Sequence, residues 1–281
     1  VEMMSRVPML SDAARVFSDP AYAVQHQMLL MGSGADLIAT RIGANREDCD
    51  AVALLSQQRA ALAQKEGRFQ SIMPVKTPEG MISEDECIRA DMTAERLATL
   101  PAAFAELGAA GADQVQLQKF PELSAIEHVH TMGNSPAMCD AGALVLLGDE
   151  ALGNSIGMAP KARLVCSTTA SGEPLEVVSG CVTATEALLA DQKLSAQDID
   201  LFEIHEAFAA TVVKTRQVLG IDDSRLNVNG GVIALGHPMG ATGAIMAGTL
   251  IDELYRQQLK NGIVAASGAA GSGSAIMLEH C

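Results

Sequence analysis

A glycine-rich run between residues 227 and 244 constrains this chain more than any other part of its sequence. It reads NVNGGVIALGHPMGATGA and holds one histidine, His237. Glycine has no Cβ and reaches positive φ at little cost, so such a run predicts a loop that approaches a ligand closely. An apolar, helix-compatible segment follows from Ala244 to about Gln257. A helix that opens there presents free N–H groups to an anion or a developing oxyanion. On spacing alone, a tight loop around a buried histidine explains the run equally well.

Net charge and cysteine spacing limit the partners of the chain. It has 19 basic and 34 acidic residues, a formal net charge of −15. Nucleic acid and anionic membranes need a basic surface, so neither is expected as a partner. No apolar stretch is long enough to span a bilayer, and the first residues do not resemble a signal peptide. The six cysteines form no CxxC pair, which argues against a metal site or disulfides and favours a cytoplasmic location. Three of them lie in apolar surroundings and are expected to be inert core residues: Cys139, Cys166 and Cys181.

The first part of the chain, residues 10–130, is polar, charged and irregular, and we expect it to form a cap over a site. Its predicted elements are a capped helix at 50–66, loops or short strands at 74–91, and helical pieces at 93–107. Gly67 ends the first of these. Proline, glycine and acidic residues interrupt the second.

From residue 141 the pattern changes to strands that alternate with helices, which indicates a layered α/β domain. The apolar run 142–147 predicts a buried strand. Further strands are expected at 162–166, 200–204, 263–266 and 275–278, and helices at 183–192 and 207–219. Gly220 ends the last of these helices.

Several motifs, in this order along the chain, resemble those of the thiolases. The segments that carry the resemblance are Val1–Met9, 31–104, His128–Ser135, Glu203–Ala210 (EIHEAFAA), the glycine-rich run and Ser267–Gly273 (SGAAGSG). The resemblance covers essentially the whole chain. It implies an α/β fold, the layered α-β-α-β-α sandwich of thiolases, with an incomplete N-terminal half and an irregular loop domain. The implied divisions are a remnant of the N-terminal core (1–9), the loop domain (10–130), a return to the core (131–175) and the C-terminal domain (176–281).

The same resemblance implies roles for individual residues. His237 matches the histidine that activates the nucleophilic cysteine and stabilises a thioester oxygen. His205 matches the position that orders a hydrogen bond at the enolate oxygen. Ser267 occupies the place of the second cysteine, the acid/base, for which a serine hydroxyl is a poor replacement. Backbone groups at Ala269 and Gly236 are the expected oxyanion contacts. No cysteine of this chain matches the nucleophile, because the chain begins after that position, and no metal site is expected.

Two interpretations of function remain open at this point. The first is an acyltransferase of the thiolase type, which cleaves 3-ketoacyl-CoA with CoA to acetyl-CoA and a shortened acyl-CoA, or runs the reverse condensation. Coenzyme A is then a substrate and no cofactor is needed. The resemblance leans towards fatty-acid oxidation, a homo-oligomer and a hydroxyacyl-CoA dehydrogenase partner. The second interpretation is a catalytically incomplete subunit that binds CoA esters or supports an active partner chain.

Overall fold

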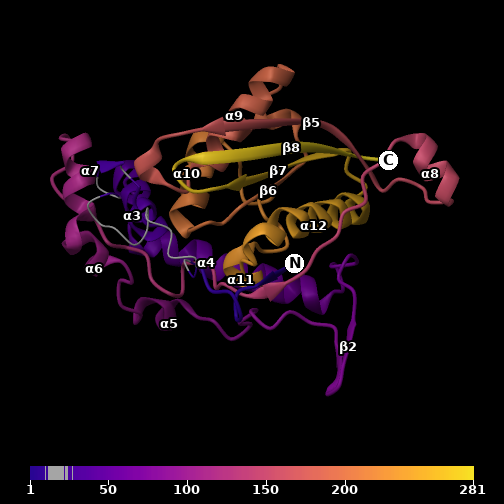
Figure 1. Ribbon diagram of the computed structural model, residues 1–281, viewed down its shortest axis with the longest axis horizontal. Coiled ribbons are helices and arrows are strands. Elements are labelled where there is room, and N and C mark those ends of the chain that lie inside the picture. Colours follow the sequence, from indigo (N-terminus) through magenta and orange to yellow (C-terminus); the bar gives the residue numbers. More distant parts are fainter. Residues whose placement is uncertain (10, 12–21, 23–24, 27) are drawn as a thin grey trace.

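A four-stranded sheet lies at the centre of the molecule (Figure 1). The structure is a computed structural model that describes residues 1–9, 11, 22, 25–26 and 28–281. In spatial order the strands are β5 (Ala162–Ser171), β8 (Ser272–His280), β7 (Asn261–Ser267) and β6 (Leu201–Ile204). β6 and β7 run parallel, and the other neighbours are antiparallel. The carboxyl ends of β6 and β7 therefore meet at one edge of the sheet, where Ile204 lies opposite Ala265.

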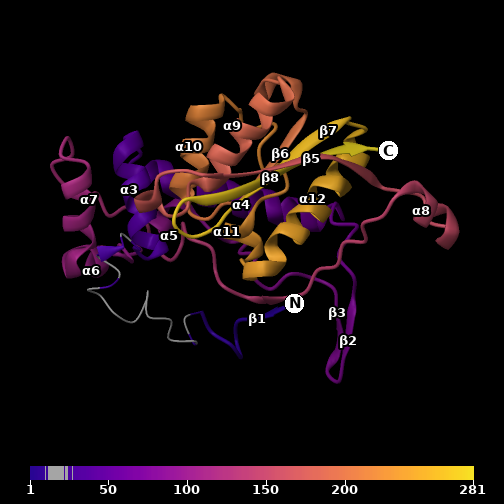
Figure 2. The same ribbon diagram turned by 45° about the horizontal axis from the view of Figure 1, so that its top comes forward.

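Helices cover both faces of this sheet (Figure 2). α9 (Gly180–Gln192) packs against β5, β7 and β8, whereas α12 (Thr242–Gln257) packs against β6, β7 and β8 from the other side. Alternate residues of β7 enter different cores. Ile263 and Ala265 join the large core that contains α9, and Val264 joins the smaller core under α12. This is the two-residue period of a strand buried on both faces, which explains why β7 has a continuous apolar sequence.

Three further helices complete the large core: α3 (Met31–Ile42) and α4 (Arg46–Lys65), which each pack on α10, and α10 itself (Ala209–Leu219). α4 begins at the predicted cap, where the Asn45 side chain accepts from the N–H of Asp48 and the Asp48 carboxylate accepts from that of Asn45. The sequence does not predict α3. Its glycines allow close packing, since a Cβ on Gly34 would lie 2.6 Å from the carbonyl oxygen of Glu176. This part of the chain is thus more regular than the expected cap.

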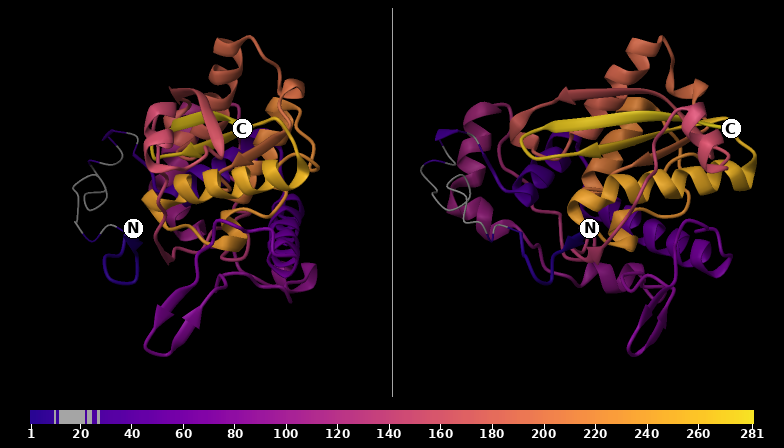
Figure 3. Two further views of the ribbon diagram at one scale, coloured as in Figure 1. Left: turned by 90° about the vertical axis from the view of Figure 1, so that its right-hand side faces the viewer. Right: turned by 45° about the vertical axis from the view of Figure 1, so that its right-hand side comes forward.

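Two short strand pairs lie outside the central sheet. β1 (Glu2–Met3) pairs with β4 (Asp140–Ala141), and β2 (Val75–Thr77) with β3 (Gly80–Ile82) in a hairpin that projects from the body (Figure 3). The buried strand expected at 142–147 is wrong. β4 ends at Ala141, and Leu144 is 94% exposed. The run is apolar, but β1 has only two residues with which a strand could pair, and nothing in the described structure covers the run.

The remaining elements are short. They are α5 (Ala94–Ala98), α6 (Ala105–Leu107), η1 (Gly108–Ala112), α7 (Asp113–Lys119), α8 (Glu150–Ile156), η2 (Pro174–Glu176), η3 (Ala196–Asp198), α11 (Val232–Leu235) and η4 (Met239–Ala241). The other predicted strands and helices are present, with ends that differ by up to five residues. Within the described part of the chain, no helix has the length and apolar character needed to cross a membrane. The domain boundaries proposed from the sequence stay predictions.

Candidate functional site

His205 lies at the carboxyl edge of the central sheet, directly after β6. Its N–H donates to the carbonyl oxygen of Ala265 (2.9 Å), which continues the β6–β7 ladder by one residue. The side chain is 4% exposed, and neither ring nitrogen has a hydrogen-bond partner in the described structure. A buried polar group without a partner is costly, and such groups concentrate where a ligand or water completes them. His205 is therefore a candidate contact for a polar atom of a ligand.

His237 reaches the same place from the glycine-rich run. Its N–H donates to the carbonyl oxygen of Ala137 (2.7 Å), which ties the loop to the 137–139 segment. Its Nδ1 lies 2.7 Å from Oγ1 of Thr242, in the first turn of α12. The rings of His205 and His237 are tilted by 46°, with centroids 4.6 Å apart. The structure thus brings the two predicted histidines into direct contact.

Burial keeps both imidazoles neutral at pH 7. It is the main cause that lowers the pKa of His205 to about 3, and the nearby His237 lowers it further. Burial also lowers the pKa of His237. Each neutral ring carries one N–H donor and one acceptor nitrogen. The Thr242 hydroxyl can donate to Nδ1 of His237 or accept from it, so Nε2 can serve as an N–H donor or as a base. Thr242 was not singled out from the sequence, although its place five residues after His237 on α12 is a usable signal.

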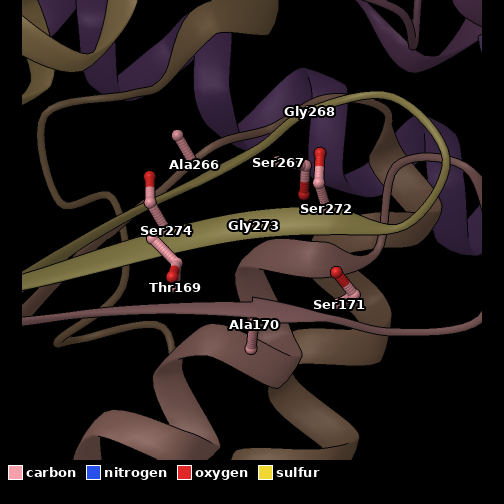
Figure 4. A pocket seen from close by; sticks show the side chains of 9 residues that line it. All are labelled: Thr169, Ala170, Ser171, Ala266, Ser267, Gly268, Ser272, Gly273 and Ser274. Carbon is pink, nitrogen blue, oxygen red and sulfur yellow. The ribbon is translucent and has the colours of Figure 1, made fainter.

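Ser267 ends β7, and its backbone lies close enough to His205 to oppose the lowering of that pKa. Its hydroxyl has a different partner. Oγ accepts a hydrogen bond from the N–H of Cys181 (3.0 Å) in the first turn of α9. Ser267 lines an open groove of about 590 Å³. Figure 4 shows the residues that line it, which are mainly small or hydroxyl-bearing. Its lining residues are Thr169, Ala170, Ser171, Ala266, Ser267, Gly268, Ser272, Gly273 and Ser274.

The two predicted backbone contacts differ in their availability. The N–H of Gly236 donates to the carbonyl oxygen of Val232 (3.0 Å), so in this structure it closes α11 and is not free to bind an oxyanion. Gly236 contributes space instead, because its φ is +88° and a Cβ there would lie 2.6 Å from Sγ of Cys139. Ala269 is exposed in the turn between β7 and β8. Ala270, not Ala269, takes the left-handed conformation, at φ +54°. The oxyanion role of Ala269 stays a prediction.

Glu206 holds the parts of this site together. It is 3% exposed, and its Oε2 accepts from the Ser56 hydroxyl of α4 (2.7 Å) and from the N–H of Ile233 in α11 (3.1 Å). Its Oε1 accepts from the Asn227 side chain (3.1 Å). One buried carboxylate therefore joins α4, the His205 segment and the glycine-rich run. This is consistent with the structural role expected for it from the sequence.

A larger cavity of about 790 Å³ lies beside the glycine-rich run. Gly236, Pro238 and Thr242 line it, as do Cys87 and Cys139. The expectation that Cys139 and Cys166 are core residues is wrong, since both are partly exposed. Cys181 is buried as expected, and burial raises its pKa to about 11.

Comparison with known protein families finds two matches along the chain. Residues 1–116 match the thiolase N-terminal domain, and residues 158–280 match the thiolase C-terminal domain. The 3-ketoacyl-CoA thiolase of Bacillus subtilis is 35% identical over 295 residues, covering all of this chain and 70% of that protein. The acetyl-CoA acetyltransferase of Allochromatium vinosum is 35% identical over 256 residues, covering 89% of this chain and 60% of that protein.

Solved structures of the same family are similar to this chain. The acetyl-CoA acetyltransferase of Bacillus anthracis has a TM-score of 0.76 and 33% identity, over 90% of this chain and 60% of that one. Human mitochondrial 3-ketoacyl-CoA thiolase in complex with CoA has a TM-score of 0.77 and 30% identity, over 92% of this chain and 60% of that one. The chain thus spans between about three fifths and 70% of the length of these relatives.

Proposed function

The chain belongs to the thiolase family, and we propose that it takes part in acyl transfer between 3-ketoacyl-CoA and CoA. The products are acetyl-CoA and an acyl-CoA shortened by two carbons, or the reverse condensation occurs. The observation that carries the proposal is the pair of neutral imidazoles, His205 and His237, with ring centroids 4.6 Å apart. Among the described residues, neither ring nitrogen of buried His205 makes a hydrogen bond of normal geometry, which supports a role in binding a substrate oxygen.

The proposed chemistry follows from what two neutral imidazoles offer. Cleavage of the 3-ketoacyl carbon–carbon bond develops negative charge on the thioester oxygen of the departing acetyl-CoA enolate. An N–H from each ring, held in place by the fold, stabilises that charge without a proton being transferred first. His237 can also accept a proton from an attacking thiol at Nε2, because Thr242 Oγ1 can accept the hydrogen bond that Nδ1–H donates in this tautomer. Coenzyme A is the second substrate, and no cofactor is needed.

No cysteine of this sequence is assigned to take the acyl group. Cys49 and Cys181 are buried, and the pKa values of Cys49 and Cys139 are raised to about 12, first of all by burial. A thiol with such a pKa supplies almost no thiolate at neutral pH. Cys87 and Cys139 line the cavity of about 790 Å³ together with Gly236.

One observation favours the second candidate function, a catalytically incomplete subunit that binds CoA esters. The Ser267 hydroxyl accepts from Cys181 N–H and has the weak acidity of an alcohol. It is therefore poorly suited to the proton transfer that the acid/base cysteine carries out in thiolases. The affinity of this subunit for CoA esters would still depend on His205 and His237.

The test compares thiolysis of acetoacetyl-CoA with binding of the same ester, using the full chain. If the chain turns over, His205→Ala and His237→Ala should each lower kcat by about 10²–10⁴-fold. His280→Ala, which removes a histidine at the far end of β8, is the matched control and should leave kcat unchanged. Ester binding without turnover, weakened by the same two substitutions, supports the incomplete subunit. Neither turnover nor binding by a folded chain would refute both proposals.

The finer assignments also rest on the family alone. We propose a role in fatty-acid oxidation, a homo-oligomeric assembly, a cytoplasmic location and a hydroxyacyl-CoA dehydrogenase as the partner enzyme. Sedimentation of the purified chain tests the assembly, and co-purification with the dehydrogenase tests the partner.

A further inference from the structure

Two cysteines from distant parts of the sequence meet at Gly236. A Cβ built on this glycine would lie 2.6 Å from Sγ of Cys139 and 3.0 Å from Sγ of Cys87. The two sulfur atoms can therefore be no farther apart than the sum of these distances. The Cys87 thiol also interacts with that of Cys139 strongly enough to raise the pKa of the latter. Both cysteines carry free thiols and both line the cavity of about 790 Å³, so they share one accessible space.

The backbone on each side of the pair is held in place. Next to Cys87, the N–H of Arg89 donates to the Gln57 side chain of α4 (2.7 Å), and Gln57 in turn donates to the carbonyl oxygen of Ile233 (3.3 Å). Next to Cys139, the carbonyl oxygen of Ala137 accepts from the N–H of His237 (2.7 Å). These contacts fix both cysteine segments to the same glycine-rich run. Two thiols held in this way meet repeatedly, which is the condition for an intramolecular disulfide.

We propose that Cys87 and Cys139 form a reversible dithiol–disulfide site that reacts with small disulfides carrying positive charge. The Cys87 thiol loses its proton and attacks one sulfur of the oxidant R–S–S–R. The S–S bond breaks, and the leaving RS⁻ takes up the proton as RSH. Cys139 then loses its proton and attacks Sγ of Cys87 in the mixed disulfide, which releases a second RSH. Two protein thiols are oxidised by two electrons in total, and one disulfide is reduced to two thiols.

The order of the two cysteines follows from their surroundings. Burial, the Cys87 thiol and the nearby carboxylates of Asp85 and Asp140 raise the pKa of Cys139 to about 12. Because the thiolate is the attacking species, Cys139 should attack the oxidant slowly in the first step. It is better placed for the second step, in which the mixed disulfide on Cys87 lies within its reach.

The charge of the cavity favours oxidants that carry positive charge. The cavity wall carries acidic residues, among them Glu84, Glu86 and Asp140, and none of the described residues that line it is basic. The whole chain adds a net charge of −15. A cationic disulfide is therefore attracted to the cavity, whereas an anionic one is repelled, and salt should weaken both effects. The site does not depend on the proposed acyl transfer, since neither imidazole takes part in the exchange.

Cystamine, a small cationic disulfide, is the probe for the experiment. The full chain carries Cys281→Ser, because Cys281 is exposed and would form mixed disulfides of its own. After reduction and exposure to cystamine, free thiols are blocked and the peptides are mapped by mass spectrometry. The expected product is one Cys87–Cys139 disulfide, with two cysteamine molecules released per chain.

Variants in the same background test each step. Cys139→Ser should stop at a mixed disulfide on Cys87 and release one cysteamine, whereas Cys87→Ser should react at least about tenfold more slowly. Cys166→Ser is the matched control and should leave the cross-link unchanged. Glutathione disulfide, which is anionic, should react about tenfold more slowly than cystamine at low salt, and the gap should shrink as salt is added. Two separate mixed disulfides on Cys87 and Cys139, or two unreacted thiols in the folded chain, would overturn the site. Equal rates for the two oxidants at low salt would overturn the charge selection.

Discussion

Replacing Gly236 with alanine should destabilise the chain more than any comparable substitution at an open left-handed glycine. Two costs add at this position. The backbone has φ +88° and ψ 162°, a region that is essentially restricted to glycine, and forcing another residue into it costs about 1–3 kcal/mol. The new methyl group would also lie 2.6 Å from Sγ of Cys139 and 3.0 Å from Sγ of Cys87. Overpacking of this kind costs about 1–3 kcal/mol. The expected loss in the free energy of unfolding is therefore about 2–6 kcal/mol.

Two comparisons separate these costs. Gly43 ends α3 at φ +70°, and a Cβ there meets nothing within 4 Å. Gly43→Ala should therefore cost only the backbone part, about 1–2 kcal/mol. In a Cys139→Ala background the nearest sulfur is gone, so Gly236→Ala should cost about 1 kcal/mol less than in the parent chain. Cys166→Ala is the matched control background and should leave the cost of Gly236→Ala unchanged.

Urea unfolding of the reduced protein, followed by far-ultraviolet circular dichroism, measures all of these free energies. A cost for Gly236→Ala no larger than that for Gly43→Ala would contradict this prediction. An equal cost with and without the Cys139 thiol would show that steric overlap with this sulfur does not contribute. In the first case the loop relaxes freely around a side chain, and the position of His237 is then less firmly set than the contacts of Gly236 imply.

Three further outcomes are expected. The pKa of an unfolded histidine is about 6.5, whereas that of folded His205 is about 3, so the stability that neutral His205 contributes is complete above pH 6.5 and is lost between pH 6.5 and 3. Acid unfolding titrations should show a smaller loss of stability for His205→Asn than for the parent chain. An equal loss would refute this expectation. Asp36→Asn should lower the free energy of unfolding in urea by about 3–5 kcal/mol, because Asp36 is a fully buried carboxylate that is hydrogen-bonded to two histidines. Arg163→Gln removes an exposed ion pair and should change this free energy little. Similar costs for the two would contradict the buried pairing. The double substitution Leu144→Ser and Leu146→Ser should reduce self-association in sedimentation velocity, since both leucines are exposed. Unchanged association would show that this apolar run does not drive self-association.

Local signals were enough to predict most of the secondary structure. The Asn45–Asp48 capping box marks the start of α4, and Gly220 marks the end of α10, because both act through backbone hydrogen bonds within a few residues. The strands β6 and β7 follow from short apolar runs bounded by polar residues. The helix α3 escaped notice because its glycines and serine weaken a helical pattern. The glycines of α3 allow close packing against its neighbours, and the spacing of residues in the sequence does not reveal this packing.

Burial could not be predicted in the same way. The run 142–147 is as apolar as β7, yet β7 is covered on both faces and Leu144 is almost fully exposed. What covers a strand is set by residues far away in the sequence. For the same reason, the meeting of Cys87 and Cys139 at Gly236 has no local signal, and Cys139 was expected to be inert.

Ser267 is predicted to occupy the place of an acid/base residue, and the structure gives its hydroxyl a structural partner. The resemblance puts Ser267, a weak acid, at the position of the acid/base cysteine of thiolases, and in the structure the Ser267 backbone lies beside His205. Its hydroxyl, however, accepts from the N–H of Cys181, one of the first-turn donors that have no partner within α9. A sulfur atom accepts hydrogen bonds weakly, so a cysteine would leave that N–H less well satisfied. At this position the chain therefore holds a residue that suits the end of a helix better than it suits proton transfer. The two imidazoles are the part of the site whose geometry fits the proposed chemistry.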